Sequence, residues 1–442
     1  MSSIQNQNPR LINLFTAICM VVANMIGTGV FTSLGFQSVE IKSGFALLFL
    51  WLVGGIFALC GALCYGELGA AMPRSGGEFH YLSQTYHPML GFISGWVSIT
   101  VGFAAPIAAA AIAFGQYFSR VFPVATPMAI APFVVIIISL IHANNLKLGS
   151  YFQSVSTVLK VLLIVVLIGC GLFIAEPQNI QFLPSLEDVQ LIWSSPFAIS
   201  LVYVTYAYSG WNASVYVASE VKEPEKNVPR SLWAGTLLVM VLYLLLNFIF
   251  LYTIPLDELA GKLEVGYLAA NRIFGAKGGE MMSLFISFGL LSSISSMVWA
   301  GPRVTQVIGE DIPFFKRLAK RNSSGIPYYA ILLQLSIVLI LVLTSTFEAV
   351  ITYLGFTLTL SSFLTVLGVF VHRLKFPDAP RPYKTWGYPV TPLIFLAISL
   401  WMLIYILLGK PVESIAGLAT IALGLPVYFL ARRNQLASST SK

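Results

Sequence analysis

The chain has 442 residues, of which 57% are hydrophobic and 10% are charged, and its formal net charge is +7. A soluble protein of this length could not bury so much apolar surface, so the composition excludes an ordinary globular enzyme and predicts a chain solvated largely by lipid. The sequence contains no Walker loop and no His/Cys cluster with metal-ligand spacing, so we expect no metal and no other cofactor.

Apolar stretches near the length of a membrane-spanning helix recur along the whole chain. They predict an all-α polytopic membrane protein with one transmembrane domain over residues 1–442 and no appended soluble module. The twelve expected spans are 12–40, 44–72, 88–118, 126–143, 151–175, 196–219, 230–254, 279–301, 327–346, 348–372, 389–408 and 412–431.

The distribution of Lys and Arg predicts which side of the membrane each loop faces. One set of alternate loops carries only Lys42, Arg120, Lys262, Arg272, Lys277 and Lys410, whereas the other loops and both termini carry the rest, apart from Lys160. Since cytoplasmic loops are enriched in Lys and Arg, we expect both termini in the cytoplasm. We expect the protein to lie in the plasma membrane of a bacterial cell. The positive charge reflects this topology and indicates no nucleic-acid partner.

The first expected span is interrupted where it should lie deepest in the bilayer. In the stretch NMIGTGVFT, Gly27 and Gly29 flank Thr28. A broken helix leaves peptide groups unpaired, which is tolerated only where they line protein or a water-filled cavity. The N–H groups of these three residues suit a carboxylate, and the carbonyl groups of Met25 and Ile26 suit an ammonium group. The alternative is a glycine notch for close helix packing.

Two other spans carry unusual residues for the lipid interior. The third span presents Ala104, Ala105 and Ala108 around Pro106, a small face that serves either tight packing or side-chain room beside a ligand. Lys160 lies about 13 Å inside the fifth span by helical rise, which is long for a side chain that snorkels to the interface. An ammonium at that depth indicates a functional group.

The sixth expected span contains a second interruption. Ser209, Gly210 and Asn212 break the apolar stretch VTYAYSGWNASVYVASE, and the carbonyl groups from Ala207 through Tyr208 to Ser209 would be freed. Together, the freed peptide groups of the two breaks could bind a small zwitterion that carries both a carboxylate and an ammonium group, such as an α-amino acid.

The two breaks occupy corresponding places in the sequence. Each lies in the first span of a five-span block, 12–175 or 196–372, and two extra helices follow in 389–431. Matched interrupted spans are typical of inverted-repeat transporters whose site lies at the membrane midplane.

Four short motifs occur in order along the chain: GTGVF (27–31), CYGELGAAMPRSGGEFHYL (64–82), YAYSGWN (206–212) and AGPRV (300–304). With them the chain resembles the amino acid–polyamine–organocation superfamily, and within it the bacterial relatives of the L-type amino acid transporters. The resemblance implies a LeuT-type fold of five plus five inverted helices and two more, with helices 1 and 6 discontinuous.

The resemblance also implies a role for Lys160. Family members that do not use sodium place a lysine on the fifth helix, where its ammonium group stands in for a cation between helices one and eight. The expected partners are carbonyl groups near Gly27 and the hydroxyl group of Ser293 or Ser296. Two roles remain open, a fixed tether and a proton carrier, and both imply transport without sodium.

The same motifs relate further residues of this chain to the family's substrate site. Tyr206 is similar to the aromatic lid of the family's substrate site, with plain packing as the alternative, and Asn212 is expected to bond the freed backbone across the break. Ser209 stands where relatives commonly have glycine. The segment 118–127 contains no cysteine, so we expect no disulfide-linked accessory subunit.

The expected function is secondary transport of amino acids, by exchange or proton coupling, and the protein is not expected to be an enzyme. No carboxylate lies near mid-membrane in a predicted pocket helix, which favours neutral amino acids over an amine, polyamine or cationic amino acid as substrate. A channel or membrane sensor on the same scaffold is the alternative from another class.

Glu67, near the end of the second span, is expected either to pair with the loop around Arg74 or to be solvated.

Overall fold

The computed structural model describes residues 12–144, 149–322 and 325–440. Within these ranges the chain is helical and contains no β-strand, as the sequence predicts. The α-helices are α1 (Leu14–Met25), α2 (Gly29–Glu40), α3 (Gly44–Ala71), α4 (Gly77–Thr85), α5 (Pro88–Val97), α6 (Ala104–Val121), α7 (Pro127–Asn144), α8 (Gly149–Phe173), α9 (Leu186–Ile192), α10 (Ser195–Ala207), α11 (Pro224–Thr253), α12 (Leu256–Leu259), α13 (Val265–Asp311), α14 (Lys316–Ala319), α15 (Tyr328–Thr344), α16 (Phe347–Lys375), α17 (Val390–Gly409) and α18 (Pro411–Thr440). A π-helical turn, η1 (Ser98–Gly102), and two 3₁₀ helices, η2 (Ala213–Glu220) and η3 (Pro313–Phe315), complete the set.

Several helices begin at a polar side chain that caps their first turn. The Asn13 side chain accepts a hydrogen bond from the N–H of Thr16, and Ser43 and Thr346 do the same at the starts of α3 and α16. Such a cap satisfies one of the N–H groups that a helix leaves unpaired at its start. These polar residues therefore mark where the apolar runs enter the bilayer.

The described helices coincide with the expected spans. Eight of them are long and apolar enough to cross a membrane, and the segments Pro127–Ala143, Thr157–Phe173 and Tyr328–Thr344 are shorter apolar helices at three more expected positions. The remaining expected span holds α10, which is bent by 67° from α9. Each predicted span thus contains an apolar helix, and the chain is a polytopic membrane protein.

Both predicted interruptions are present. α1 ends at Met25 and α2 begins at Gly29, with a bend over residues 26–28. α10 ends at Ala207, turns follow over residues 208–212, and the chain continues as the 3₁₀ helix η2. Gly210 has φ 96°, a left-handed conformation that glycine adopts without strain, so this residue allows the second break.

The two broken spans lie against each other in opposite directions. α2 packs on α10, and α1 packs on η2, so the first half of each span meets the second half of the other. A Cβ atom on Gly29 would lie 2.4 Å from the Cα atom of Ala207, and one on Gly210 would lie 2.8 Å from the carbonyl oxygen of Asn24. The glycines are therefore required for this close approach, and the packing reading of the first break is correct for Gly29.

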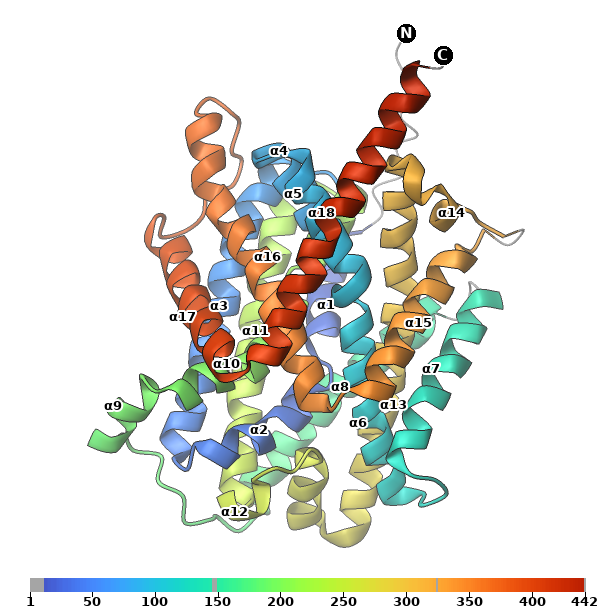
Figure 1. Cartoon of the computed structure of the whole chain (residues 1–442). Helices are drawn as coiled ribbons and strands as arrows, with labels where there is room; N and C mark the ends of the chain where they lie inside the picture. Colours follow the sequence, from blue (N-terminus) through green and yellow to red (C-terminus); the bar gives the residue numbers. More distant parts are fainter. Residues whose placement is uncertain (1–11, 145–148, 323–324, 441–442) are drawn as a thin grey trace.

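The chain ends lie at the same end of the helix bundle, as an even number of spans requires (Figure 1). α4 and α14 lie at this end too, whereas α9 and α12 lie at the opposite end (Figure 1). The segments that carry most of the Lys and Arg residues are therefore gathered on the side of the termini.

One span and two connecting segments have helical detail of their own. The third span is interrupted by η1, and Pro106, which has no N–H to donate, lies one turn after it. The outward segment 255–278, whose mixed charges and short apolar stretches favour a small helix pair, contains α12 and the start of α13, which bends at Gly275, whose φ is 77°. The inward segment 73–87 contains the helix α4.

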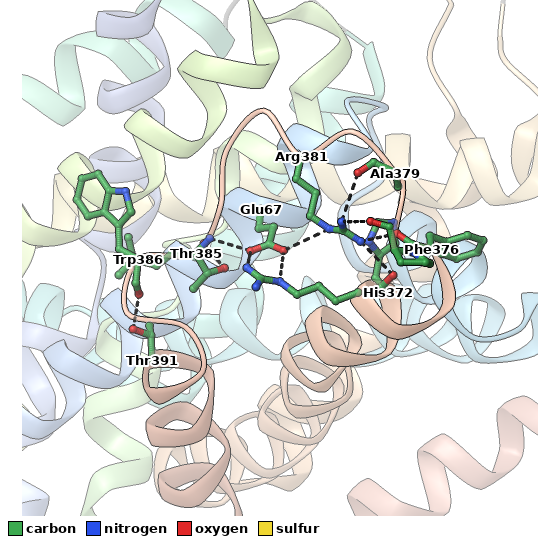
Figure 2. Close-up of polar contacts among 11 residues, drawn as sticks. Glu67, His372, Phe376, Ala379, Arg381, Thr385, Trp386 and Thr391 are labelled. Atoms are coloured by element: carbon green, nitrogen blue, oxygen red, sulfur yellow. Dashed lines mark hydrogen bonds and ion pairs between the residues drawn. The ribbon is translucent and has the colours of Figure 1, made fainter.

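A buried ion pair joins α3 to α16 and to the segment before α17. Figure 2 shows Glu67 between Arg381 and Thr385. Arg373 donates two parallel hydrogen bonds of 2.7 Å to the Glu67 carboxylate, and the N–H of Thr385 donates a third, also 2.7 Å long. Since the Glu67 side chain is 2% exposed, neither the expected contact with Arg74 nor solvation is correct.

Candidate functional site

A small cavity lies between the two helix breaks. Its wall is formed by Met25, Gly27, Thr28 and Gly29 of the first break and by Tyr206, Ala207 and Ser209 of the second. Its volume is about 20 Å³, which is room for roughly one water molecule. The structure thus brings the two predicted halves of the site together, in a closed arrangement.

The helix ends at this cavity carry opposite partial charges. α2 begins at Gly29, and the first N–H groups of a helix have no earlier turn to bond to, so this end is electropositive. α1 ends at Met25 and α10 ends at Ala207, and the last carbonyl groups of a helix make an electronegative end. The wall therefore offers both hydrogen-bond donors and acceptors.

Two of the freed carbonyl groups already have partners. The Tyr243 hydroxyl group donates to the carbonyl oxygen of Met25 at 2.6 Å, and the Lys160 ammonium group donates to that of Ile26 at 3.1 Å. A carbonyl oxygen has two lone pairs, so each can accept one more hydrogen bond. Tyr243 was missed by the sequence reasoning, since a tyrosine within an apolar helix looks like ordinary packing.

Lys160 connects the first break to α13. Its side chain comes from α8 and is 7% exposed, and the ammonium group also donates to the Ser293 hydroxyl group at 2.7 Å. The expected contacts of Lys160 are therefore present. Ser296 does not touch the ammonium group and instead donates to the Ser293 carbonyl oxygen at 3.0 Å, although both serines line the cavity.

Tyr206 closes one side of the cavity. Its hydroxyl group is hydrogen-bonded to the Thr28 hydroxyl group, across the two breaks, and its ring meets the Phe347 ring edge-on. The side chain is 7% exposed. This contact between the two broken spans covers the space between the helix ends.

Other predicted site residues lie outside the cavity wall. Ala105 is fully buried in α6, and the wall there is formed by Pro106 and Ala110. The Tyr208 hydroxyl group points to the Trp51 carbonyl oxygen at 3.3 Å. Gly210 packs on Asn24 as described above.

Asn212 also has a different environment from the one expected. Its amide group donates to Glu78 at 3.5 Å and to the Tyr216 hydroxyl group at 3.2 Å, so its contacts are with side chains rather than with the freed backbone. The cavity wall includes Ala23, Asn24 and Met297, which no motif had singled out.

The two glycines of the first break should respond differently to an added methyl group. In Gly29→Ala the new Cβ would overlap Ala207, and overpacking of this kind costs about 1–3 kcal/mol. In Gly27→Ala the nearest atom is the Met25 carbonyl oxygen at 4.0 Å, so the fold should tolerate it. We expect the melting temperature of detergent-purified protein to fall for Gly29→Ala only. Equal melting temperatures would contradict the close approach of α2 and α10.

Comparisons with known proteins agree with this architecture. The family model described as amino acid permease matches residues 12–430. The chain is 28% identical to the b(0,+)-type amino acid transporter 1 of Mus musculus, over 95% of this chain and 87% of that protein. It is 28% identical to a serine/threonine exchanger of Bacillus subtilis (strain 168), over 95% and 96%. It is 29% identical to the large neutral amino acids transporter small subunit 2 of Mus musculus, over 95% and 80%.

Proposed function

The chain belongs to the amino acid permease family and is an amino acid transporter, and we propose that it carries neutral L-amino acids by alternating access around its two broken spans. The observation that carries this proposal is the meeting of the electropositive start of α2 with the electronegative ends of α1 and α10 at one cavity. An amino acid carries a carboxylate and an ammonium group on one carbon, which such a pair of helix ends can hold at once.

The residues of the cavity wall favour an uncharged side chain on the substrate. Among the described residues, those that line the cavity include no Asp, Glu, Lys or Arg. A cationic side chain would need a carboxylate counter-ion at this depth, because an unpaired charge in the bilayer interior is costly. We therefore place an amine, polyamine or cationic amino acid second among the candidate substrates.

Binding requires the two broken spans to move apart. The cavity holds about one water molecule, so an amino acid fits only after its wall opens. Tyr206 and Thr28 lie on different spans, and breaking their contact would open the space between the helix ends. We propose that Tyr206 acts as the lid, and that rocking of the two inverted repeats, 12–175 and 196–372, exposes the site to each side in turn.

The transport mode that we favour is exchange. One of the similar proteins is named a serine/threonine exchanger, and small hydroxylated or aliphatic amino acids suit the small wall residues Gly27, Ala110 and Ala207. The direct test is uptake of a radiolabelled amino acid panel into proteoliposomes that contain, or lack, unlabelled amino acid. Saturable uptake that depends on internal amino acid supports exchange. Ion currents without saturable uptake would support a channel instead.

Transport should not depend on sodium. The Lys160 ammonium group bonds the Ile26 carbonyl oxygen and the Ser293 hydroxyl group, so a positive charge already occupies the space between α1 and α13. We expect the initial rate of uptake to be unchanged when K⁺ replaces Na⁺ on both sides of the proteoliposome membrane. A several-fold fall in rate would refute this role of Lys160.

We also propose a location and a subunit composition. We place the protein in the plasma membrane of a bacterium, as the similar bacterial exchanger suggests. The basic side of the bundle carries both termini, which supports an orientation with both termini in the cytoplasm. The four cysteines are free and lie within membrane spans, and the segment 118–127 has none, which supports function without a disulfide-linked accessory subunit.

A further inference from the structure

Glu78 is a buried carboxylate outside the membrane spans. It lies in the first turn of α4, in the segment between the second and third spans, and is 6% exposed. Four side chains donate hydrogen bonds to it: Tyr65 at 2.6 Å, Ser361 at 2.9 Å, Ser362 at 3.3 Å and Asn212 at 3.5 Å. Its partners come from α3, from α16 and from the break in the sixth span.

Among the residues that the structure describes, no cation is paired with this carboxylate. The titratable and polar groups that face it are Tyr65 on α3, Tyr81 on α4, Asn212 and Tyr216 around the start of η2, and Ser361 and Ser362 on α16. In the part of the chain that the structure describes, no Lys, Arg or His forms an ion pair with Glu78. Buried carboxylates are usually paired, so this arrangement calls for an explanation.

The surroundings of Glu78 act on its pKa in two opposite directions. Burial raises the pKa of the Glu78 carboxyl group, and the hydrogen bonds from Tyr65, Ser361, Ser362 and Asn212 lower it in part. An ionised carboxylate accepts hydrogen bonds at about four lone-pair positions, which matches this set of donors. The present arrangement therefore suits the ionised form, and loss of donors would favour the protonated form.

The donors belong to a part of the protein that the proposed transport cycle moves. Asn212 lies within the interruption of the sixth span and is also bonded to Tyr216 of η2. If the repeat 196–372 rocks relative to the repeat 12–175, Asn212, Ser361 and Ser362 separate from Glu78. A carboxylate that remains buried without them binds a proton more tightly, so proton binding and the conformational change are linked.

We propose that Glu78 is a proton-binding site that couples cytoplasmic pH to the conformational cycle of the transporter. The proposal rests on the proposed function, because it requires the sixth span to move. Glu78 gives up its proton to water when Asn212 and the two serines of α16 close on it, and takes one proton from water when they leave. Lys160 is not involved, since it lies on the other side of the break, against Ile26 and Ser293.

The test is the pH profile of amino acid exchange in proteoliposomes with equal pH on both sides. For the wild type we expect the rate to change through one titration step. Glu78→Gln should hold the rate at its low-pH level throughout, because a neutral amide resembles the protonated carboxyl group. Glu223→Gln is the matched control, since Glu223 is exposed and paired with Lys226, and it should keep the step. A profile of Glu78→Gln that matches the wild type would overturn the proposal.

Tyr65→Phe separates proton binding from a structural role. Removing this hydrogen bond to the ionised form should move the midpoint of the step to higher pH by about one unit. A purely structural contact would lower the rate without moving the midpoint. If Glu78→Gln does not fold, the pH profile of Tyr65→Phe tests the proposal alone. A titration midpoint equal to that of the wild type then overturns it.

A measurement without transport distinguishes failure of this proposal from failure of the proposed function. Because the carboxyl pKa is raised in the folded state, the folded protein binds the proton more tightly than the unfolded chain. Stability should therefore fall as pH rises from the ordinary carboxyl pKa to the raised one, and Glu78→Gln should remove that fall in melting temperature. If the protein shows this fall in melting temperature but does not exchange amino acids, only the proposed function is contradicted. If it exchanges amino acids normally but does not show the fall, the proton site is contradicted.

Discussion

Replacing Arg373 with alanine should lower the free energy of unfolding by about 3–5 kcal/mol, the usual cost of removing one partner of a buried ion pair. Arg373 supplies the bidentate contact to Glu67, whose side chain is 2% exposed. Without it, the carboxylate keeps the Thr385 N–H at 2.7 Å and the more distant Arg381, at 3.9 Å. One N–H donor does not replace a paired guanidinium group, so α3 and α16 should separate more easily. The melting temperature of purified protein measures the loss.

Two comparisons make this expectation specific. Arg321→Ala removes an exposed partner of Glu310, a contact of 3.4 Å, and surface pairs of this kind contribute about 0–1 kcal/mol. The double variant Glu67→Gln with Arg373→Met removes both buried charges, and it should be more stable than Arg373→Ala alone because no unpaired carboxylate remains. If Arg373→Ala and Arg321→Ala melt at the same temperature, the buried pair does not hold the helices together.

The sequence predicted the breaks because they depend on local chemistry. Glycine and serine residues in the middle of two apolar stretches weaken a helix wherever the stretch lies, so Gly27, Gly29 and Gly210 could be recognised without a structure. Lys160 stood out for a similar reason, since an ammonium group is rare at that depth. Its partner Ser293 came from the family resemblance, because nothing local to either residue indicates the contact.

The partners of the two buried carboxylates could not be predicted in this way. Glu67 and Arg373 are 306 positions apart, and Glu78 and Ser361 are 283 apart. A glutamate near a helix end, or in a polar stretch such as SGGEFHYL, has the same local pattern whether it is solvated or folded into the bundle. The contacts depend on how α16 packs against α3 and α4, which no short motif determines.

The residues that form the cavity wall could likewise be predicted only in part from the sequence. The small face of the third span was expected from its alanines, but the π-helical turn at Ser98–Gly102 shifts which residues face inward, so Pro106 and Ala110 line the cavity in place of Ala105. Tyr243 of α11 donates a hydrogen bond to the Met25 carbonyl oxygen, and no motif in the sequence indicated a role for that helix. A helix break must have its freed groups satisfied, and the residues that do so come from elsewhere in the chain.

Replacing Lys160 with methionine should reduce exchange by about 10- to 150-fold, the range that corresponds to loss of a hydrogen bond from a charged group worth about 1.5–3 kcal/mol. Methionine fills the space of the aliphatic stem but donates nothing to the Ile26 carbonyl oxygen at 3.1 Å or the Ser293 hydroxyl group at 2.7 Å. The first break is then no longer tied to α13, and the end of α1 loses the position that it needs to hold the ammonium group of the substrate. Initial rates in proteoliposomes, normalised to the amount of reconstituted protein, measure the effect.

Variants of the two serines should give a graded series with Lys160→Met. Ser293→Ala removes one of the two contacts of the ammonium group and should have a smaller effect, whereas Ser296→Ala leaves both contacts in place and should have the least. Both serines line the cavity, so a simple loss of wall polarity would affect the two variants equally. The order Lys160→Met, Ser293→Ala, Ser296→Ala therefore distinguishes the tie between the broken span and α13 from a general disturbance of the cavity. A Lys160→Met protein that exchanges at the wild-type rate would remove this lysine from the transport mechanism.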